Sequence, residues 1–217
     1  MKFKFIVWSF ALSMMLFSCG NDKKTDKTTA STPKPAVAQT CTYTPIKEGI
    51  KVHWTAFKTT KRIGVKGTFD DVKAETKVNA KSISNMINAT TFLIHTSSVN
   101  SNNEGRDKKL VEFFFGKFAS TDIAGLMQSA LGDNMKGEGN INLTMNGMAK
   151  DVPYTYTVEG DILKVHTVID TDKWNGQKAI ASINKACKDK HTGADGVSKT
   201  WNDVDVVVEV PFTRNCK

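Results

Sequence analysis

The side chains that most often carry out catalysis or bind metals are few in this chain of 217 residues. The four histidines are His53, His95, His166 and His191, and no two have the His-x-His or His-x-x-x-His spacing of a metal site. The sequence has no Gly-x-Ser-x-Gly motif, no phosphate-binding loop and no dinucleotide fingerprint. Asp189–Gly196 is no calcium loop either, because its ligand positions are wrong and no terminal Glu follows. We therefore expect no catalytic residue, no metal and no enzymatic activity.

A charged pair, Arg106-Asp107, ends the polar stretch that begins at Asn100, and it is a candidate for contact with a polar ligand. Two roles fit this pair: it could meet the headgroup of a ligand, or it could hold its own loop in place. Exposed ion pairs usually contribute little beyond local structure. The loop-pinning role is therefore favoured, and the headgroup role stays open.

Three of the four cysteines belong to the part of the chain that we expect to fold. Cys41 lies just before the first expected strand and Cys216 just after the last. If these two strands pair antiparallel, both cysteines come to the same end of the sheet, which predicts a Cys41–Cys216 disulfide in an oxidising compartment. Cys187 would then be a free thiol, or an alternative partner in the disulfide.

The N-terminal segment predicts export. Two lysines precede a short apolar run, and Leu16-Phe17-Ser18-Cys19-Gly20 resembles a bacterial lipobox, in which the Cys sulfur receives a diacylglycerol. We therefore divide the chain into a lipoprotein signal peptide (1–18), a lipidated Cys19 with a disordered tether (19–40) and a folded domain (41–217). The alternatives are an ordinary signal peptide with a chance cysteine and an uncleaved membrane helix, for which the apolar run is short.

The expected address is the bacterial cell envelope, facing the periplasm or at the cell surface. Acyl chains on Cys19 would make the membrane a partner, because multiple chains give a stable anchor. The formal net charge of +8 is a moderate basic excess, which could attract anionic headgroups. Nucleic acid is not an expected partner, because an exported chain without a binding motif has no means to read it. The sequence names no protein partner.

The element around which the domain is organised is Met135–Ile169, where apolar residues recur at every second position in three consecutive runs. Side chains alternate across a strand, so this pattern predicts three antiparallel strands with one wet face. The two connectors, Asn146-Gly147 and Glu159-Gly160-Asp161, are hairpin turns, because glycine tolerates positive φ.

Further strands are expected on both sides of this meander. They are 50–59, 62–69, 72–78, 90–99 and, with strict alternation, 201–213, while 82–88 could form one helical turn. Trp174–Lys188 has the spacing of an amphipathic helix. Residues 118–131 are ambiguous: propensity favours a helix, but the sheet needs one more strand before Met135, so we predict a strand. The fold class is therefore all-β, an antiparallel barrel of about eight strands with one amphipathic helix and short helical turns.

Two motifs resemble the YceI-like family of polyisoprenoid-binding, lipocalin-like proteins. The first is the polar loop with Asn-Glu-x-Arg-Asp-x-x-Leu and a Phe-Phe pair, at 103–114. The second is the hairpin Leu143–Lys150, with Gly147 and Lys150 at matching positions. The resemblance spans roughly 43–213, and departs from the family at Lys109, where a His is usual, and in the longer 172–201 region.

The resemblance implies an apolar cavity inside the barrel that holds an isoprenoid chain, such as a quinone tail or a prenyl lipid, with no other cofactor. Eight strands enclose room for side chains or for one slender ligand. Small inward residues such as Gly67, Gly137 and Gly139 would free volume. The expected apolar lining is Trp54, Val65, Phe69, Phe92, Phe113, Phe114, Ile141, Leu143 and Tyr154.

Two functions follow from these expectations. The first is an envelope-tethered carrier or reservoir of an isoprenoid lipid. The alternative is a non-catalytic interaction module, in which the same aromatic residues fill the barrel and the outer surface contacts another envelope protein.

Overall fold

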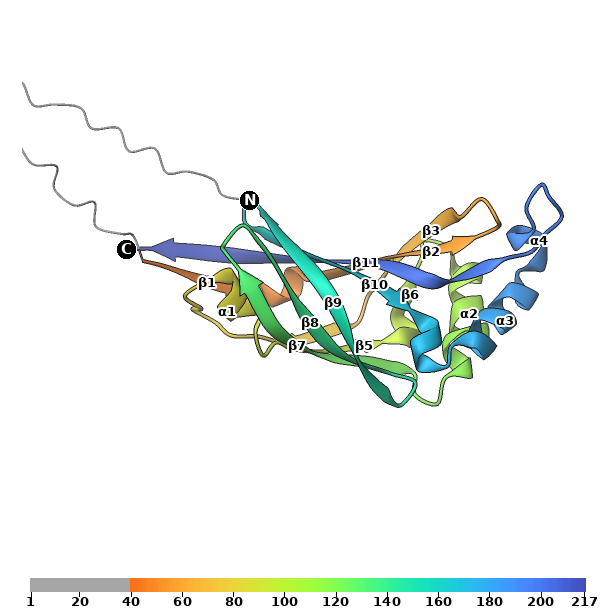
Figure 1. Ribbon diagram of the computed structural model, residues 1–217, viewed down its shortest axis with the longest axis horizontal. Coiled ribbons are helices and arrows are strands. Elements are labelled where there is room, and N and C mark those ends of the chain that lie inside the picture. The colour runs from red at the N-terminus through yellow and green to blue at the C-terminus, as the bar shows by residue number, and fades with distance from the viewer. Residues whose placement is uncertain (1–39) are drawn as a thin grey trace, which may run out of the picture. The chain divides into compact units, whose positions relative to one another are not determined.

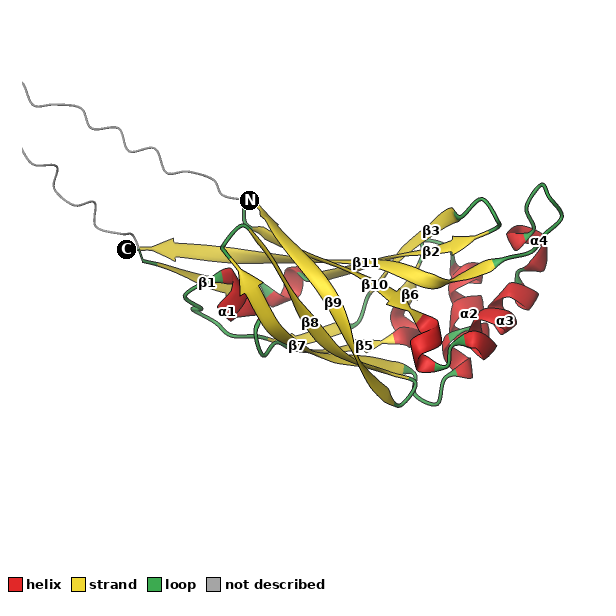
Figure 2. Ribbon diagram, viewed as in Figure 1, coloured by secondary structure: helices red, strands yellow, loops and turns green. Residues whose placement is uncertain are grey.

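The predicted meander forms the middle of the sheet. A computed structural model describes residues 40–217, and the predicted signal peptide, Cys19 and the tether up to residue 39 lie outside the described residues. The meander consists of β8 (Lys136–Met145), β9 (Met148–Glu159) and β10 (Ile162–Asp170). Asn146 and Gly147 have φ of 51° and 72°, the left-handed values that a tight two-residue hairpin requires. Figures 1 and 2 show these strands as long, twisted ribbons.

The other strands extend the sheet on both sides of the meander. The order of neighbours is β4-β5-β7-β8-β9-β10-β11-β2-β3-β6, all antiparallel where paired, and β1 pairs with the end of β11. The bounds are β1 (Cys41–Pro45), β2 (Lys51–Lys58), β3 (Ile63–Phe69), β4 (Val72–Glu75), β5 (Thr91–His95), β6 (Val99–Asn100), β7 (Asp122–Gly132) and β11 (Thr200–Cys216).

The two ends of this sheet meet, because β3 and β4 follow each other directly in the chain. Their partners β6 and β5 also belong to one stretch, so the ladder continues across Asp70-Asp71 through backbone bonds from Asp70 N to Ser98 O (3.0 Å) and from His95 N to Asp71 O (3.2 Å). With β3–β4 and β5–β6 each counted as one kinked strand and β1 set aside, the eleven strands become eight. The predicted fold class, an antiparallel barrel, is confirmed.

The ambiguous segment 118–131 is a strand over most of its length. β7 pairs with β5 on one side and β8 on the other. The pairing of β7 with β8 shifts its register between Gln128 and Leu131, and Ser129 in this interval has a φ of 52°. The apolar residues of the segment are spaced as in a helix, but the segment is an irregular strand. Pairing with two neighbours supplies backbone bonds that outweigh helix propensity.

Helices lie at the two ends of the barrel (Figure 2). They are α1 (Ile83–Ile87), α2 (Glu104–Phe113), α3 (Gln177–Ala186) and α4 (Lys188–His191), with short 3-10 turns η1 (Lys47–Gly49), η2 (Thr96–Ser98), η3 (Phe115–Lys117) and η4 (Thr171–Trp174). α1 contacts β1 and β7, while α2 and α3 contact each other at the opposite end. α2 is as long as the predicted helix α3. None of the helices within residues 40–217 has the length and apolar character needed to cross a membrane.

Cys41 and Cys216 form a disulfide, which is the pairing predicted from the sequence. The two residues are register partners in the β1–β11 ladder, and Thr40 and Lys217 exchange two further backbone hydrogen bonds. Both ends of the domain therefore lie together at the α1 end of the barrel.

Candidate functional site

Two adjoining cavities follow each other along the barrel. The deep cavity, of about 160 Å³, lies toward the α1 end, and the mouth cavity, of about 390 Å³, lies under α2 and α3. They share five lining residues, which are Phe69, Ile123, Met145, Ile169 and Val206. Because the inward residues of β11 line first the mouth cavity and then the deep cavity, the two form one path along the barrel axis.

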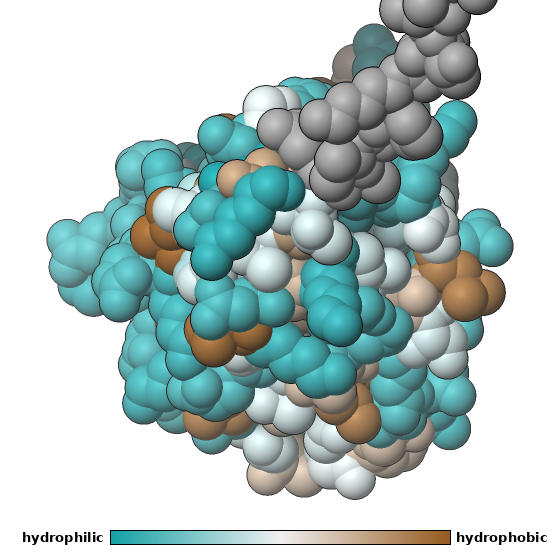
Figure 3. Space-filling model, turned by 90° about the vertical axis from the view of Figure 1, so that its left-hand side faces the viewer, coloured by the Kyte–Doolittle hydropathy of each residue, from teal (hydrophilic) through white to brown (hydrophobic). Residues whose placement is uncertain are grey.

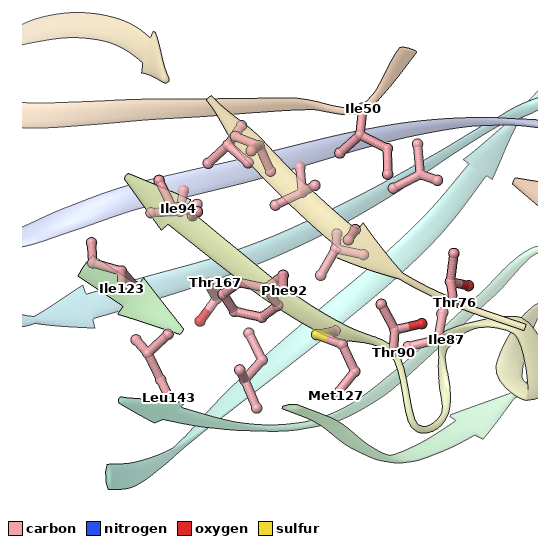
Figure 4. A pocket seen from close by; sticks show the side chains of 18 of the residues that line it. Ile50, Thr76, Ile87, Thr90, Phe92, Ile94, Ile123, Met127, Leu143 and Thr167 are labelled. Carbon is pink, nitrogen blue, oxygen red and sulfur yellow. The ribbon is translucent and has the colours of Figure 1, made fainter. Parts of the chain in front are cut away.

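The lining of the deep cavity is almost entirely apolar. Apart from three threonines, every side chain that lines it is apolar, as Figure 4 shows for Ile94, Phe92 and Leu143. The hydroxyls of Thr76 and Thr90 both donate to Met86 O, at 3.1 and 3.0 Å, and the hydroxyl of Thr167 donates to Pro153 O at 2.8 Å. The lining therefore offers no free hydroxyl hydrogen to a ligand.

The mouth cavity combines an apolar wall with cationic side chains. Its wall includes Ile180 and Ile183 of α3 and Leu110 and Phe114 of α2. Four cations also line it, from β2, α2 and α4: Lys58, Arg106, Lys109 and Lys190. No Asp or Glu lines this cavity, and none of the four cations has an ion-pair partner within residues 40–217.

His191 lies among these cations. Its Nδ1 is 2.7 Å from the Thr200 hydroxyl, which in turn donates to Asn184 Oδ1. Since the Thr200 hydrogen is used, Nδ1 is the donor to Thr200. Burial, followed by the charges of Lys58 and Lys109, lowers the pKa of His191. The imidazole is therefore neutral at pH 7, and the positive field of the cavity comes from the lysines and Arg106.

Most of the residues expected to line a cavity do so. Phe69, Phe92, Ile141 and Leu143 line the deep cavity, and Trp54, Val65, Phe69 and Phe114 line the mouth cavity. Phe113 and Tyr154 line neither. Phe113 is half-buried with Lys117 near its ring, whereas Tyr154 is buried within the wall.

Arg106 and Asp107 do not act as a pair. Asp107 accepts hydrogen bonds from Ser101 N (2.9 Å) and from the Ser101 hydroxyl (2.5 Å), so it pins its own loop. Arg106 lines the mouth cavity instead. Adjacent helical residues point in different directions, and this separates the two roles that the sequence left as alternatives.

The glycines expected to free volume in the cavity do not do so. Gly67, Gly137 and Gly139 stand opposite Trp54, Tyr156 and Tyr154 on neighbouring strands, and in each pair the aromatic ring lies over the glycine. A Cβ at Gly139 would lie 2.4 Å from the Tyr154 hydroxyl oxygen. Phe92 covers Gly125 in the same way. The space left by each missing side chain is therefore filled by a ring from the next strand.

Sequence reasoning missed several lining residues. Val206, Val208 and Val210 of β11 line the deep cavity, and Ile180, Ile183 and Lys190 line the mouth cavity. The strict alternation of β11 was the available signal for the valines. No pattern marks Lys190, because its place depends on how α4 folds back over the barrel end. Within the described part of the chain, no three His, Cys, Asp or Glu side chains lie close enough together to hold a metal ion.

Comparison with known proteins supports the fold. Among solved structures, BcnA of Burkholderia cenocepacia is 13% identical with a TM-score of 0.53, covering 78% of this chain and 99% of its own. A polyisoprenoid binding domain from Saccharophagus degradans, implicated in plant cell wall breakdown, is 11% identical with a TM-score of 0.54, covering 80% and 99%. Among curated protein sequences none matches the chain.

A model of the YceI-like domain matches residues 43–212, which is most of the chain and nearly all of the described part. That range begins in β1 and ends in β11, so it contains the whole barrel and both cavities. The chain therefore belongs to the YceI-like domain family.

Proposed function

We propose that this protein binds an isoprenoid lipid, with the hydrocarbon chain in the deep cavity and the polar end in the mouth cavity. We further propose that it is tethered in the cell envelope through acylated Cys19 and acts there as a carrier or reservoir. The observation that carries the proposal is the deep cavity, whose few hydroxyls all donate to backbone carbonyls.

This arrangement selects for a ligand without polar groups along its chain. A polar group placed in the deep cavity would lose its water and find no donor among the lining side chains, at a cost of about 1–3 kcal/mol. A hydrocarbon chain would gain about 25 cal/mol for each Å² of its surface removed from water. A quinone tail or a prenyl chain has this character over its full length.

The similar structures support the same class of ligand. The Saccharophagus degradans protein is described as a polyisoprenoid binding domain, and it shares the fold of this chain. The alternative of a filled barrel, acting only through its outer surface, is less well supported, because two adjoining cavities occupy the interior.

The test is a pair of substitutions on neighbouring residues of β11. Val208 lines the deep cavity, whereas Val207 pairs with His53 and His166 and faces the other side of the sheet. We expect Val208→Trp to remove co-purifying lipid, measured by mass spectrometry of an organic extract. Val207→Trp should retain the lipid.

The melting temperature separates binding from packing. In a barrel that holds a ligand, Val208→Trp should melt close to lipid-stripped wild type, because the added ring occupies the ligand's space. Wild-type protein that carries no lipid, together with a clear loss of stability in Val208→Trp, would contradict the carrier function.

The proposed anchor has its own test. Cys19→Ala should release the protein from the membrane fraction, because the acyl chains would be the anchor. Retention of this variant on membranes after a carbonate wash would show that another feature holds the protein there.

A further inference from the structure

The mouth cavity opens at an end of the barrel where two loops form a basic rim, which we define as residues 58–63 and 188–201. The loops lie side by side: Thr59 N donates to Lys199 O at 2.9 Å, and the Thr60 hydroxyl donates to Asp195 Oδ2 at 2.5 Å. The rim carries six Lys or Arg against two Asp. Asp195 accepts hydrogen bonds from the Thr60 hydroxyl and the Val197 amide and keeps its negative charge. The six cations outnumber the two carboxylates, so the net charge of the rim is positive.

Aromatic and aliphatic side chains are interleaved with these cations. The Arg62 guanidinium lies over the Phe57 ring at 4.1 Å and the Trp201 ring at 4.8 Å, and Lys199 Nζ lies 3.7 Å from the Trp201 ring centroid. Ile63 and Val197, one from each loop, are 50% and 49% exposed. Trp with Lys and Arg is the composition favoured at the boundary between headgroups and hydrocarbon of a bilayer.

At the opposite end of the barrel, part of the basic charge is paired with carboxylates, although Lys77, Lys81 and Lys136 there have no ion-pair partner among residues 40–217. There, Lys47, Lys164 and Arg214 each pair with a carboxylate, of Glu75, Glu159 and Asp161. Figure 3, which views the molecule from this side, shows a mostly hydrophilic surface with hydrophobic residues scattered singly. In the rim, Arg62 is the one cation with an ion-pair partner, Asp203, among residues 40–217.

We infer that the basic rim docks on a membrane surface that contains anionic lipid headgroups, with Ile63 and Val197 entering the headgroup region. What passes through the docked mouth rests on the proposed function, but the docking itself does not. A hydrocarbon chain that moves between a bilayer and the mouth cavity avoids exposure to water only if the mouth faces the bilayer. The basic charge selects anionic headgroups, and the attraction extends over about one Debye length.

The experiment is sedimentation with vesicles of phosphatidylcholine, alone or mixed with phosphatidylglycerol. The full chain carries Cys19→Ala throughout, so that no acyl chain contributes. We expect binding to the mixed vesicles, weaker binding to phosphatidylcholine alone, and a loss of binding as the salt concentration rises. Lys61→Gln, Lys188→Gln and Lys199→Gln combined should weaken binding to mixed vesicles by at least about tenfold.

The matched control is a triple substitution at the α1 end, Lys77→Gln, Lys81→Gln and Lys136→Gln, which removes the same charge. It should leave vesicle binding nearly unchanged. Equal losses in the two triple variants would overturn the inference, because binding would then follow net charge alone. Absence of wild-type binding to mixed vesicles, or equal binding to both kinds, would also overturn it.

A second measurement keeps this inference separate from the proposed function. None of the three substituted rim lysines lines a cavity. The rim variant should therefore still co-purify with lipid. Vesicle docking without any bound lipid would support the rim and contradict the carrier function, whereas bound lipid without docking would do the reverse.

Discussion

Gly139 shows how closely the wall of the barrel is packed at the level of single residues. The Tyr154 ring from β9 lies over this glycine of β8, and a Cβ would be 2.4 Å from the Tyr154 hydroxyl and 2.9 Å from Gln128 O. We therefore expect Gly139→Ala to lower the free energy of unfolding by about 1–3 kcal/mol, the usual cost of overpacking. Urea denaturation measures this change.

A glycine in an open position provides the comparison. In α2, a Cβ at Gly105 would meet only Asn103 Oδ1, at 3.6 Å. Gly105→Ala should therefore leave stability unchanged or raise it, because alanine favours a helix. Equal effects of the two substitutions would show that Tyr154 yields easily and does not pack tightly over Gly139.

His191 gives the fold a pH dependence. Its pKa is lowered by burial and by Lys58 and Lys109, so the folded state prefers the neutral ring. The stability that this preference contributes is present above the ordinary pKa of 6.5 and is lost as the pH falls from there through the lowered pKa. We expect wild type to lose stability between pH 7 and pH 5 in thermal melts, and His191→Gln to lose less. His166→Gln, on an exposed position of β10, should behave as wild type.

At the scale of elements, the C-terminal end of α3 carries a cysteine whose chemical reactivity can report whether the mouth cavity is occupied. Cys187 caps α3, lines this cavity and is the one free cysteine among the described residues. In a Cys19→Ala background, a bound lipid should slow the alkylation of Cys187 by a maleimide. A cysteine placed at Lys81, with Cys187→Ser, should react at the same rate with and without lipid. Equal rates for Cys187 in both states would show that the lipid leaves the mouth cavity open.

Sequence patterns predict those strands and helices whose own residues carry a clear periodicity. β8, β9 and β10 each bury one face, and alternate residues of β11 line the cavities, so alternation alone locates these strands. The capping residue at the start of α2 is Asn103, whose Oδ1 accepts from Arg106 N, whereas the hydroxyl of nearby Ser101 donates to Asp107. Several polar residues in a row offer equivalent caps, and only the path of the loop decides among them.

The candidate site was less accessible to sequence reasoning. Alternation gives the inward face of a strand, but it does not say whether a ring stands in the cavity or lies along the wall. Tyr154 lies along the wall because its cross-strand neighbour is a glycine. The lysines of the mouth cavity come from elements far apart in the chain, and their convergence depends on the closure of the barrel.

At the scale of the whole molecule, one covalent bond closes nearly the entire domain. Cys41 and Cys216 are 175 residues apart, and the chain-entropy account gives a loop of this size roughly 4–5 kcal/mol of stabilisation. We expect Cys41→Ser with Cys216→Ser to lower the free energy of unfolding by up to this amount, measured by urea denaturation. Cys187→Ser should have little effect, and a similar loss in that variant would show that free Cys187 contributes to packing more than its partial burial indicates.

The position of α1 has a consequence for the length of chain that the barrel can hold. Met86 and Ile87 of α1 stand at the far end of the deep cavity, while Thr200 and Trp201 line the mouth cavity. The intervening part of β11, from Thr200 to Val210, is about 33 Å long at ~3.3 Å per residue. Tilted as barrel strands are, it covers about 25 Å along the axis. For a lipid that enters tail first, α1 limits how far the tail can advance. A chain shorter than this distance would place its headgroup inside the barrel beyond the lysines of the mouth cavity, and a longer chain would leave its headgroup outside the mouth.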